Sequence, residues 1–115
     1  MPTWTQGLLI TDSALVDNPI IFASRGFLTL TGYEEADIVG RNCRFLQGAD
    51  TDRATVAAIR EAVNERRRFD GEILNYRKDG RPFWNQLAIG PLTTETSDSL
   101  FVALQFDASA RHPAL

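Results

Sequence analysis

The only cysteine of the chain, Cys43, lies in a short segment, Gly40–Gly48, that also holds two arginines, an asparagine and a glutamine. A single thiol cannot form an intrachain disulfide or complete a thiolate-rich metal site, so a reactive role for Cys43 requires a cofactor or a substrate. The alternative is a small buried apolar side chain, which free cysteines often are. The polar neighbours Asn42 and Arg44 weaken that alternative.

Three primary amides fall on strand faces that should be apolar. Alternation groups Asn85 and Gln105 with apolar residues, and Asn75 lies between Leu74 and Tyr76. An amide offers a donor and an acceptor at once, so a cluster of amides in an apolar pocket suits a planar heterocycle with imide carbonyls and N–H groups. Each amide alone could instead point outward or pair with the backbone, because burial without a partner costs about 1–3 kcal/mol.

An arginine shares the apolar stripe of the clearest predicted helix. Val56, Arg60 and Val63 are spaced so that they lie on one helical face. Either Arg60 extends to solvent from the edge of the stripe, or its guanidinium meets a bound anion. Taken with the amides and with Arg44 and Gln47, the second possibility describes a pocket for a heterocycle with a phosphate tail.

The elements that must position these residues follow an α+β plan. We expect short strands near residues 8–10 and 19–23, a short helix from about residue 24, a turn or two over 34–39, and then a helix capped by Asp50 or Thr51 that runs to about Arg66. Long strands over 69–77, 81–92 and 100–107 follow, and Lys78-Asp79-Gly80 predicts a hairpin between the first two. The order predicts a five-stranded antiparallel sheet with helices covering one face.

Composition narrows the class of protein. The 115 residues, of which 43% are hydrophobic, fit one domain with one core. The net charge of -3 argues against nucleic acid as a partner, although Arg66–Arg68 could form a basic patch; these arginines also suit a helix C-terminus. We find no apolar run long enough for a membrane span and no signal peptide, so we expect a cytoplasmic protein with no membrane partner and no metal site.

The segment Gly40–Gly48 resembles the flavin-binding signature of LOV domains, the blue-light-sensing branch of the PAS fold. The similarity continues in residues 17–23, 30–33, 51–56, 75–80 and 83–85. It covers about residues 7–108, which leaves 1–6 and 109–115 as expected tails. The resemblance implies a PAS/LOV fold and a photoreceptor rather than an enzyme.

The resemblance also implies a cofactor and a photochemical cycle. FMN is expected ahead of FAD or riboflavin. Cys43 matches the cysteine whose sulfur adds to flavin carbon C4a after blue light, in a bond that later breaks thermally. Gln105 matches the glutamine that faces N5 and O4, and its amide would rotate when N5 becomes protonated.

The remaining matched positions are expected to bind the cofactor. Arg44 and Arg60 match the residues that hold the phosphate, Gln47 lies in the same pocket, and Asn75 and Asn85 match the pair that hydrogen-bonds the pyrimidine edge. Positions that match the pocket lining are Thr11, Asn18, Asn42, Leu46, Val56, Val63, Leu87, Ile89 and Phe101.

The outer face of the predicted sheet is strongly apolar. Leu100, Val102, Leu104 and Phe106 alternate with the inward set, and Trp84 should also point outward. Such a surface predicts a homodimer packed sheet to sheet, or a flanking helix of a longer sensor. The effector is not predicted. The rival interpretation is a light-insensitive PAS-type module that binds another ligand or a protein, with Cys43 inert.

Overall fold

The computed structural model describes residues 6–112; the predicted tail residues 1–5 and 113–115 lie outside the described residues. Gln6, which we expected in the tail, is the first residue of a strand. The elements in chain order are β1 (Gln6–Asp12), β2 (Ile20–Ala23), α1 (Arg25–Thr31), α2 (Glu35–Ile38), the 3-10 helix η1 (Cys43–Leu46), α3 (Arg53–Asn64), β3 (Phe69–Tyr76), β4 (Pro82–Leu92), β5 (Leu100–Asp107) and the 3-10 helix η2 (Ser109–Arg111).

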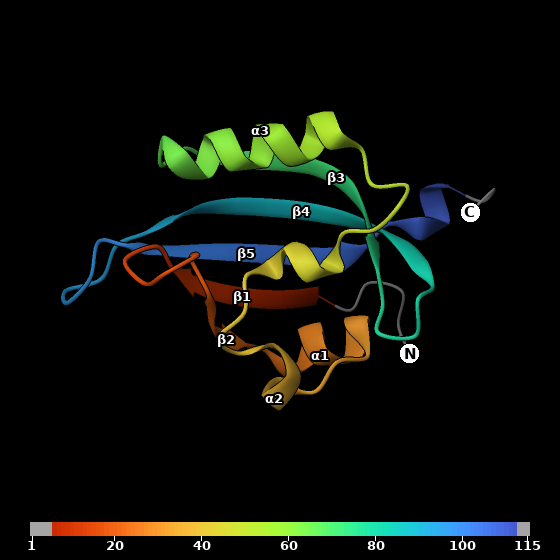
Figure 1. Ribbon diagram of the computed structural model, residues 1–115, viewed down its shortest axis with the longest axis horizontal. Helices are drawn as coiled ribbons and strands as arrows, with labels where there is room; N and C mark the ends of the chain where they lie inside the picture. Colours follow the sequence, from red (N-terminus) through yellow and green to blue (C-terminus); the bar gives the residue numbers. More distant parts are fainter. Residues whose placement is uncertain (1–5, 113–115) are drawn as a thin grey trace.

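The strands form one five-stranded sheet in the order β2-β1-β5-β4-β3 (Figure 1). Every neighbouring pair is antiparallel, which confirms the predicted sheet. The Asp-Gly signal is also confirmed, because β3 and β4 form a hairpin whose turn contains Gly80 with φ of +88°. The last strand of the chain thus lies in the centre of the sheet, between β1 and β4.

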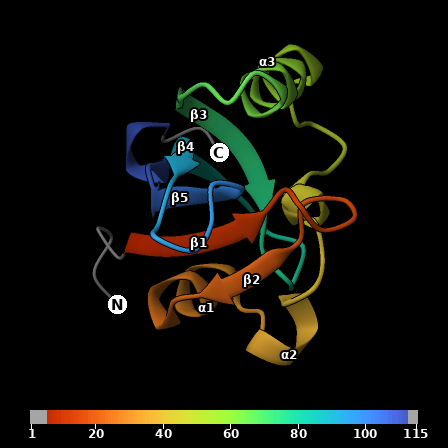
Figure 2. The same ribbon diagram turned by 90° about the vertical axis from the view of Figure 1, so that its left-hand side faces the viewer.

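The two faces of the sheet are covered differently. Figure 2 shows α3 and η1 on one side of the sheet and η2 on the other. The helix α1 packs close to β1, because Gly26 has no Cβ to meet the backbone carbonyl of Gln6. We call the side that faces η1 and α3 the inner face, and the side that faces η2 the outer face.

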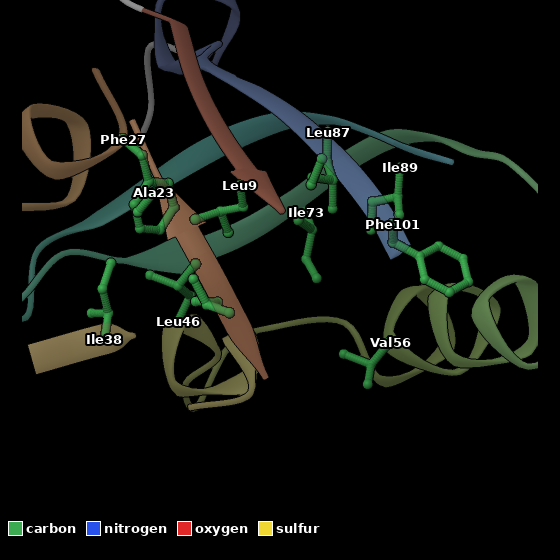
Figure 3. Close-up of a cluster of buried hydrophobic side chains, with 12 residues drawn as sticks. Leu9, Ala23, Phe27, Ile38, Leu46, Val56, Ile73, Leu87, Ile89 and Phe101 are labelled. Carbon is green, nitrogen blue, oxygen red and sulfur yellow. The ribbon is translucent and has the colours of Figure 1, made fainter. Parts of the chain in front are cut away.

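The core lies between the inner face and the helices. In Figure 3, Leu87, Ile89 and Phe101 project from the sheet, while Leu46 and Val56 come from η1 and α3. All five are buried. The alternation predicted for β4 and β5 is therefore confirmed, and it fixes which residues of each strand face the interior.

The start of α3 differs from the prediction. The N-cap is Asp52, whose carboxylate accepts a hydrogen bond from the Thr55 N–H at 3.2 Å, so a cap at Asp50 or Thr51 is wrong. The hydroxyl of Thr51 is buried and donates to the Leu74 carbonyl at 2.7 Å. This contact ties the segment before α3 to β3 and leaves Asp52 as the capping side chain.

The end of α3 also comes earlier than expected. The helix stops at Asn64, and Arg66 adopts a left-handed conformation with φ of +52°. Because a left-handed residue cannot continue a right-handed helix, the chain turns there toward β3.

Candidate functional site

The three amides meet on the inner face. The Asn85 side-chain Nδ2 donates to Asn75 Oδ1 at 2.9 Å and to Gln105 Oε1 at 3.0 Å. The exposed fractions are 4% for Asn75 and 1% for both Asn85 and Gln105, so none of them points outward. The strand register explains this contact. Asn85 opposes Ile73, which is two residues from Asn75 on β3, and Leu87, two residues after Asn85 on β4, opposes Gln105 on β5. The prediction that these amides lie buried among apolar residues is confirmed.

Two buried oxygens have no hydrogen-bond partner among the described residues. They are Asn85 Oδ1, in the amide cluster, and Asn18 Oδ1, in the loop between β1 and β2. An unpaired buried acceptor costs about 1–3 kcal/mol, so each calls for a donor from outside the protein. As a free acceptor, Asn85 Oδ1 suits an N–H group set between carbonyls, and it therefore fits the imide N–H of a flavin.

Cys43 is the first residue of η1. The preceding residue, Asn42, caps this short helix, since its Oδ1 accepts from the Arg44 N–H at 3.0 Å. As a whole residue Cys43 is half-buried, and its side chain packs against the hydrophobic core. Burial raises the pKa of the Cys43 thiol above its ordinary value, so the sulfur carries its proton at neutral pH.

The segment after Cys43 is held against the sheet. Phe45 makes an edge-to-face contact with Tyr33 at 5.0 Å between ring centroids, and the Arg41 guanidinium carbon lies 4.5 Å from the centroid of Phe45. Gly48 lies directly against the Tyr76 ring, where a Cβ would collide. These contacts fix η1, and with it Cys43, relative to β3.

The arginines lie at the rim rather than in the core. Arg44 is exposed, and both of its terminal nitrogens contact the Asp17 carboxylate, with a closest approach of 2.5 Å. Gln47 is half-buried and accepts a long hydrogen bond from Arg53 at 3.5 Å. The expected phosphate-side residues are therefore close to solvent.

Arg60 follows the solvent-facing alternative that its spacing left open. Its side chain is exposed and makes no ion pair within residues 6–112, whereas Val56 is buried and Val63 is half-buried. The long side chain of Arg60 leaves the apolar stripe at its edge and reaches solvent. Contact with an anion at that edge stays a prediction.

The apolar candidates surround the same interior as the amides. Leu46, Val56, Leu87, Ile89 and Phe101 belong to the main core cluster, and Val63 packs against it. Thr11 is buried on β1 and opposes Phe101 on β5. Asn42 is instead half-buried beside Cys43 and donates to the Asp17 carbonyl at 2.7 Å.

Two charged residues at this site were missed by the sequence analysis. Asp17, the partner of Arg44, is separated from it by 27 positions. Arg66 lies over the ring of Phe101, with its guanidinium carbon 4.8 Å from the ring centroid. Neither periodicity nor a local motif predicts contacts between residues this far apart in sequence. The only signal in the sequence was an acidic residue next to Asn18, between the first two predicted strands.

The basic patch considered for nucleic acid is engaged within the protein. Besides Arg66 on Phe101, Arg67 pairs with Glu65 at 2.9 Å and Arg68 pairs with Asp70 at 2.7 Å. These partners within the protein account for the three arginines without a nucleic acid. In the part of the chain that the structure describes, no helix is long and apolar enough to cross a membrane, and no group of three or more His, Cys, Asp or Glu side chains could hold a metal ion.

The outer face is apolar and partly covered by the end of the chain. The His112 ring stacks on Trp84 with 4.3 Å between centroids, and the Arg111 guanidinium carbon lies 5.8 Å from the Phe106 centroid. Glu72 holds this segment in place, since its carboxylate lies 2.7 Å from His112 Nε2. Leu104 remains 39% exposed.

Comparison with known proteins places these features in a family. Residues 6–110 match the model of the PAS domain. The chain is 50% identical to Phototropin-2 of Oryza sativa subsp. japonica over 90% of this chain and 12% of that protein. It is 45% identical to a blue-light photoreceptor of Listeria monocytogenes over 92% of this chain and 42% of that protein. The chain thus spans less than half the length of these two relatives.

A solved structure of matching size narrows the family further. The LOV domain from the Erythrobacter litoralis EL346 blue-light activated histidine kinase superposes with a TM-score of 0.85 at 38% identity, over 94% of this chain and 98% of that one. The dark structure of the Aureochrome1 LOV domain gives a TM-score of 0.86 at 44% identity, over 94% of this chain and 79% of that one. With this coverage and identity, the chain belongs to the LOV branch of the PAS domain family.

Proposed function

We propose that this LOV domain is a blue-light photoreceptor that binds FMN without a covalent bond in the dark and forms a reversible bond from Cys43 to the flavin in the light. Homology to LOV proteins implies a flavin chromophore, and the relatives include a protein named as a blue-light photoreceptor. The observation that carries the proposal is the buried amide cluster in which Asn85 Oδ1 lacks a partner within the described residues. A domain without a ligand there would keep an unpaired acceptor in its core.

Cofactor binding is assigned to three sets of residues. The amides of Asn75 and Asn85 hold the pyrimidine edge, because amides offer both donors and acceptors and these two are buried among apolar side chains. The apolar set around Leu87 and Phe101 contacts the ring system. Arg44 and Arg60 hold the phosphate at the rim, where a charged group stays near solvent and a guanidinium can bind it through two N–H groups.

The bound flavin supplies absorption of blue light and a ring carbon that a thiol can attack. Cys43 would supply the sulfur for a bond to flavin carbon C4a and the proton for N5; when that bond breaks thermally, the proton would return to the sulfur. The raised pKa of the buried thiol supports this step, because the sulfur holds the required proton at neutral pH. No substrate is changed in the cycle, so the proposed role is that of a sensor rather than an enzyme.

The signal is proposed to leave through β5. Gln105 faces inward, and the next residue, Phe106, faces the outer side where Arg111 lies over it. The chain continues to Ala108, whose N–H donates to the Trp84 carbonyl at 2.8 Å. Rotation of the Gln105 amide therefore occurs one residue away from the outer face and the C-terminal segment.

A homodimer through the outer face remains part of the proposal. Leu104 is exposed, and Leu100, Val102 and Phe106 are only half-buried. Residues 109–112 cover Trp84 and Phe106 but leave Leu104 exposed, so an apolar surface remains for a second copy. The effector that receives the signal is not identified by these contacts.

The binding part of the proposal is tested by flavin release. The purified protein, after incubation with FMN and removal of free flavin, should be yellow, and denaturation should release FMN rather than FAD or riboflavin in a chromatographic assay. Protein that stays colourless would rule out the flavin site. Protein that binds flavin but never bleaches in blue light would favour the light-insensitive module.

A further inference from the structure

Asp17 contacts both neighbours of Cys43. Its backbone carbonyl accepts from Asn42 Nδ2 at 2.7 Å, and its carboxylate accepts from both terminal nitrogens of Arg44. Asn42 Oδ1 in turn accepts from the Arg44 N–H at 3.0 Å. The three residues form a closed ring of contacts between the loop that follows β1 and the start of η1.

The backbone of this loop is held in an unfavourable conformation. Asp17 has φ of +69° and Asn18 has φ of +47°, a left-handed region that residues other than glycine rarely adopt. Such residues persist where surrounding contacts impose them, and they gather at binding sites. The adjacent Asn18 Oδ1 is one of the two buried oxygens without a partner among residues 6–112. The loop beside Cys43 and Arg44 therefore holds one buried acceptor that a bound ligand could satisfy.

The contact between Asp17 and Arg44 uses only one edge of the guanidinium. Both carboxylate oxygens lie 3.1 Å from Arg44 Nη1 and 2.5 Å from Nη2. Within the described part of the chain, Arg44 Nε makes no hydrogen bond. A planar guanidinium can bind one anion through its two terminal nitrogens and a second through the edge that contains Nε. The pairing with Asp17 thus leaves an edge for a phosphate.

We infer that Asp17 is a positioning residue that orients Arg44 and makes the site selective for a flavin that carries a phosphate. This inference rests on the proposed flavin-binding function. An unrestrained arginine would lose rotamer freedom when it binds a phosphate, whereas the contact with Asp17 has already removed part of that freedom.

Repulsion between the Asp17 carboxylate and the phosphate acts in the opposite direction but is weak. The side chains of Arg44 and Asp17 are 54% and 56% exposed, so solvent and salt screen the interaction between the two anions. Screening acts less on the direct contact between Asp17 and Arg44, which is 2.5 Å at its closest, than on the repulsion between two anions on different edges of the guanidinium. The net effect of Asp17 is therefore to strengthen the binding of the phosphate-bearing flavin.

The test compares FMN with riboflavin, which lacks the phosphate. Asp17→Asn removes the charge but keeps a residue that tolerates the left-handed backbone, and Asp17→Gly removes the side chain without backbone strain. Flavin-free protein is titrated with each flavin by fluorescence. For both variants we expect the dissociation constant of FMN to rise about fivefold and that of riboflavin to stay within about twofold of wild type. Glu95→Gln, the same charge change at an exposed loop position, should alter neither constant.

A double-mutant cycle shows whether Asp17 acts through Arg44. In an Arg44→Gln background, Asp17→Asn should have no further effect on FMN binding. Equal weakening of FMN and riboflavin would mean that Asp17 only supports the fold, and unchanged or tighter FMN binding would mean that it competes with the phosphate; either result overturns the inference. If the wild-type protein binds both flavins, such a result leaves the proposed function intact. If it binds neither flavin, the proposed function fails first.

Discussion

Each of the two faces of the sheet carries an exception to the usual distribution of polar and apolar side chains. On the inner face, three amides are buried together, and Asn85 Oδ1 has no partner among the described residues. On the outer face, Val102 is half-buried and Leu104 is exposed. Soluble domains ordinarily bury apolar groups and expose polar ones, so both deviations need a cause. The proposed flavin would account for the inner face, and the proposed second copy of the chain would account for the outer face.

The strand β4 carries both environments in consecutive residues. Asn85 points inward, while its neighbours Trp84 and Gln86 point outward toward the C-terminal segment. Because side chains alternate along a strand, a shift in register by one residue would exchange the two surfaces. Substitutions at two adjacent positions of β4 therefore compare the inner face with the outer face at nearly the same point of the strand.

The largest expected effect comes from the inner face of β4. Asn85→Leu removes the unpaired acceptor and leaves Asn75 and Gln105 without their shared donor, so we expect FMN affinity to fall by about 100-fold or more. Gln86→Leu, the matched change on the outer face, should leave FMN affinity within about twofold. Fluorescence titration measures both. Equal effects of the two variants would remove the distinction between the faces.

A smaller effect is expected from the outer face. Wild-type protein should form a dimer at about tens of micromolar, and Leu104→Arg should weaken that dimer at least about tenfold, because it buries an unpaired charge in an apolar interface. Analytical ultracentrifugation measures the association. Val39→Arg, at another exposed apolar position, serves as the control. A wild-type monomer, or equal loss of the dimer in the control, would contradict a sheet-to-sheet interface.

The edge of the inner face is tested at Arg60. Arg60 is exposed, so Arg60→Gln should weaken FMN about fivefold if the guanidinium binds the phosphate, and should leave riboflavin unchanged. Parallel titrations with the two flavins provide the measurement. An unchanged FMN affinity would assign Arg60 to solvent and restrict the phosphate contact to Arg44.

The smallest effect concerns the pH dependence of stability. Burial raises the folded-state pKa of the Cys43 thiol above its ordinary value of 9.0. The protonated thiol therefore contributes stability that is fully present below the unfolded-state pKa and is lost as pH rises through the folded-state pKa. Between pH 7 and 9.5, the wild-type free energy of unfolding should fall by less than about 1 kcal/mol relative to Cys43→Ala. Chemical denaturation of both proteins at each pH measures this change. A wild-type free energy of unfolding that stays constant or rises with pH relative to that of Cys43→Ala would contradict a buried thiol.

Local signals predicted most of the fold because they act over a few residues. The Asp79-Gly80 turn, the start of α1 near residue 24 and the alternation in β5 each depend on neighbours in sequence, and each is found as expected. The cap of α3 was misplaced because the Thr51 hydroxyl is engaged outside the helix: it accepts from the Gly48 N–H at 3.0 Å and donates to the Leu74 carbonyl, a contact across 23 positions. The pattern of residues along a helix cannot predict a contact with a strand so far away in the sequence.

In the candidate site, too, the features that depend on local sequence were predicted, and the contacts between distant segments were not. The burial of Asn75, Asn85 and Gln105 followed from alternation, since each lies among apolar neighbours on a strand. The pairing of Asp17 with Arg44 and the position of Arg66 over Phe101 depend on how separate elements dock, and they were not predicted. Arg60 shows the limit of a spacing argument, because a long side chain can leave an apolar stripe at its edge.

The dark, illuminated and recovered absorption spectra of one flavin-loaded sample test the central claim most directly. We predict a structured blue band that bleaches under blue light and returns in darkness, and a Cys43→Ala variant that keeps the band but does not bleach. A band that bleaches and recovers equally in the Cys43→Ala variant would contradict a bond to Cys43. A wild-type band that never bleaches would contradict the photoreceptor function itself.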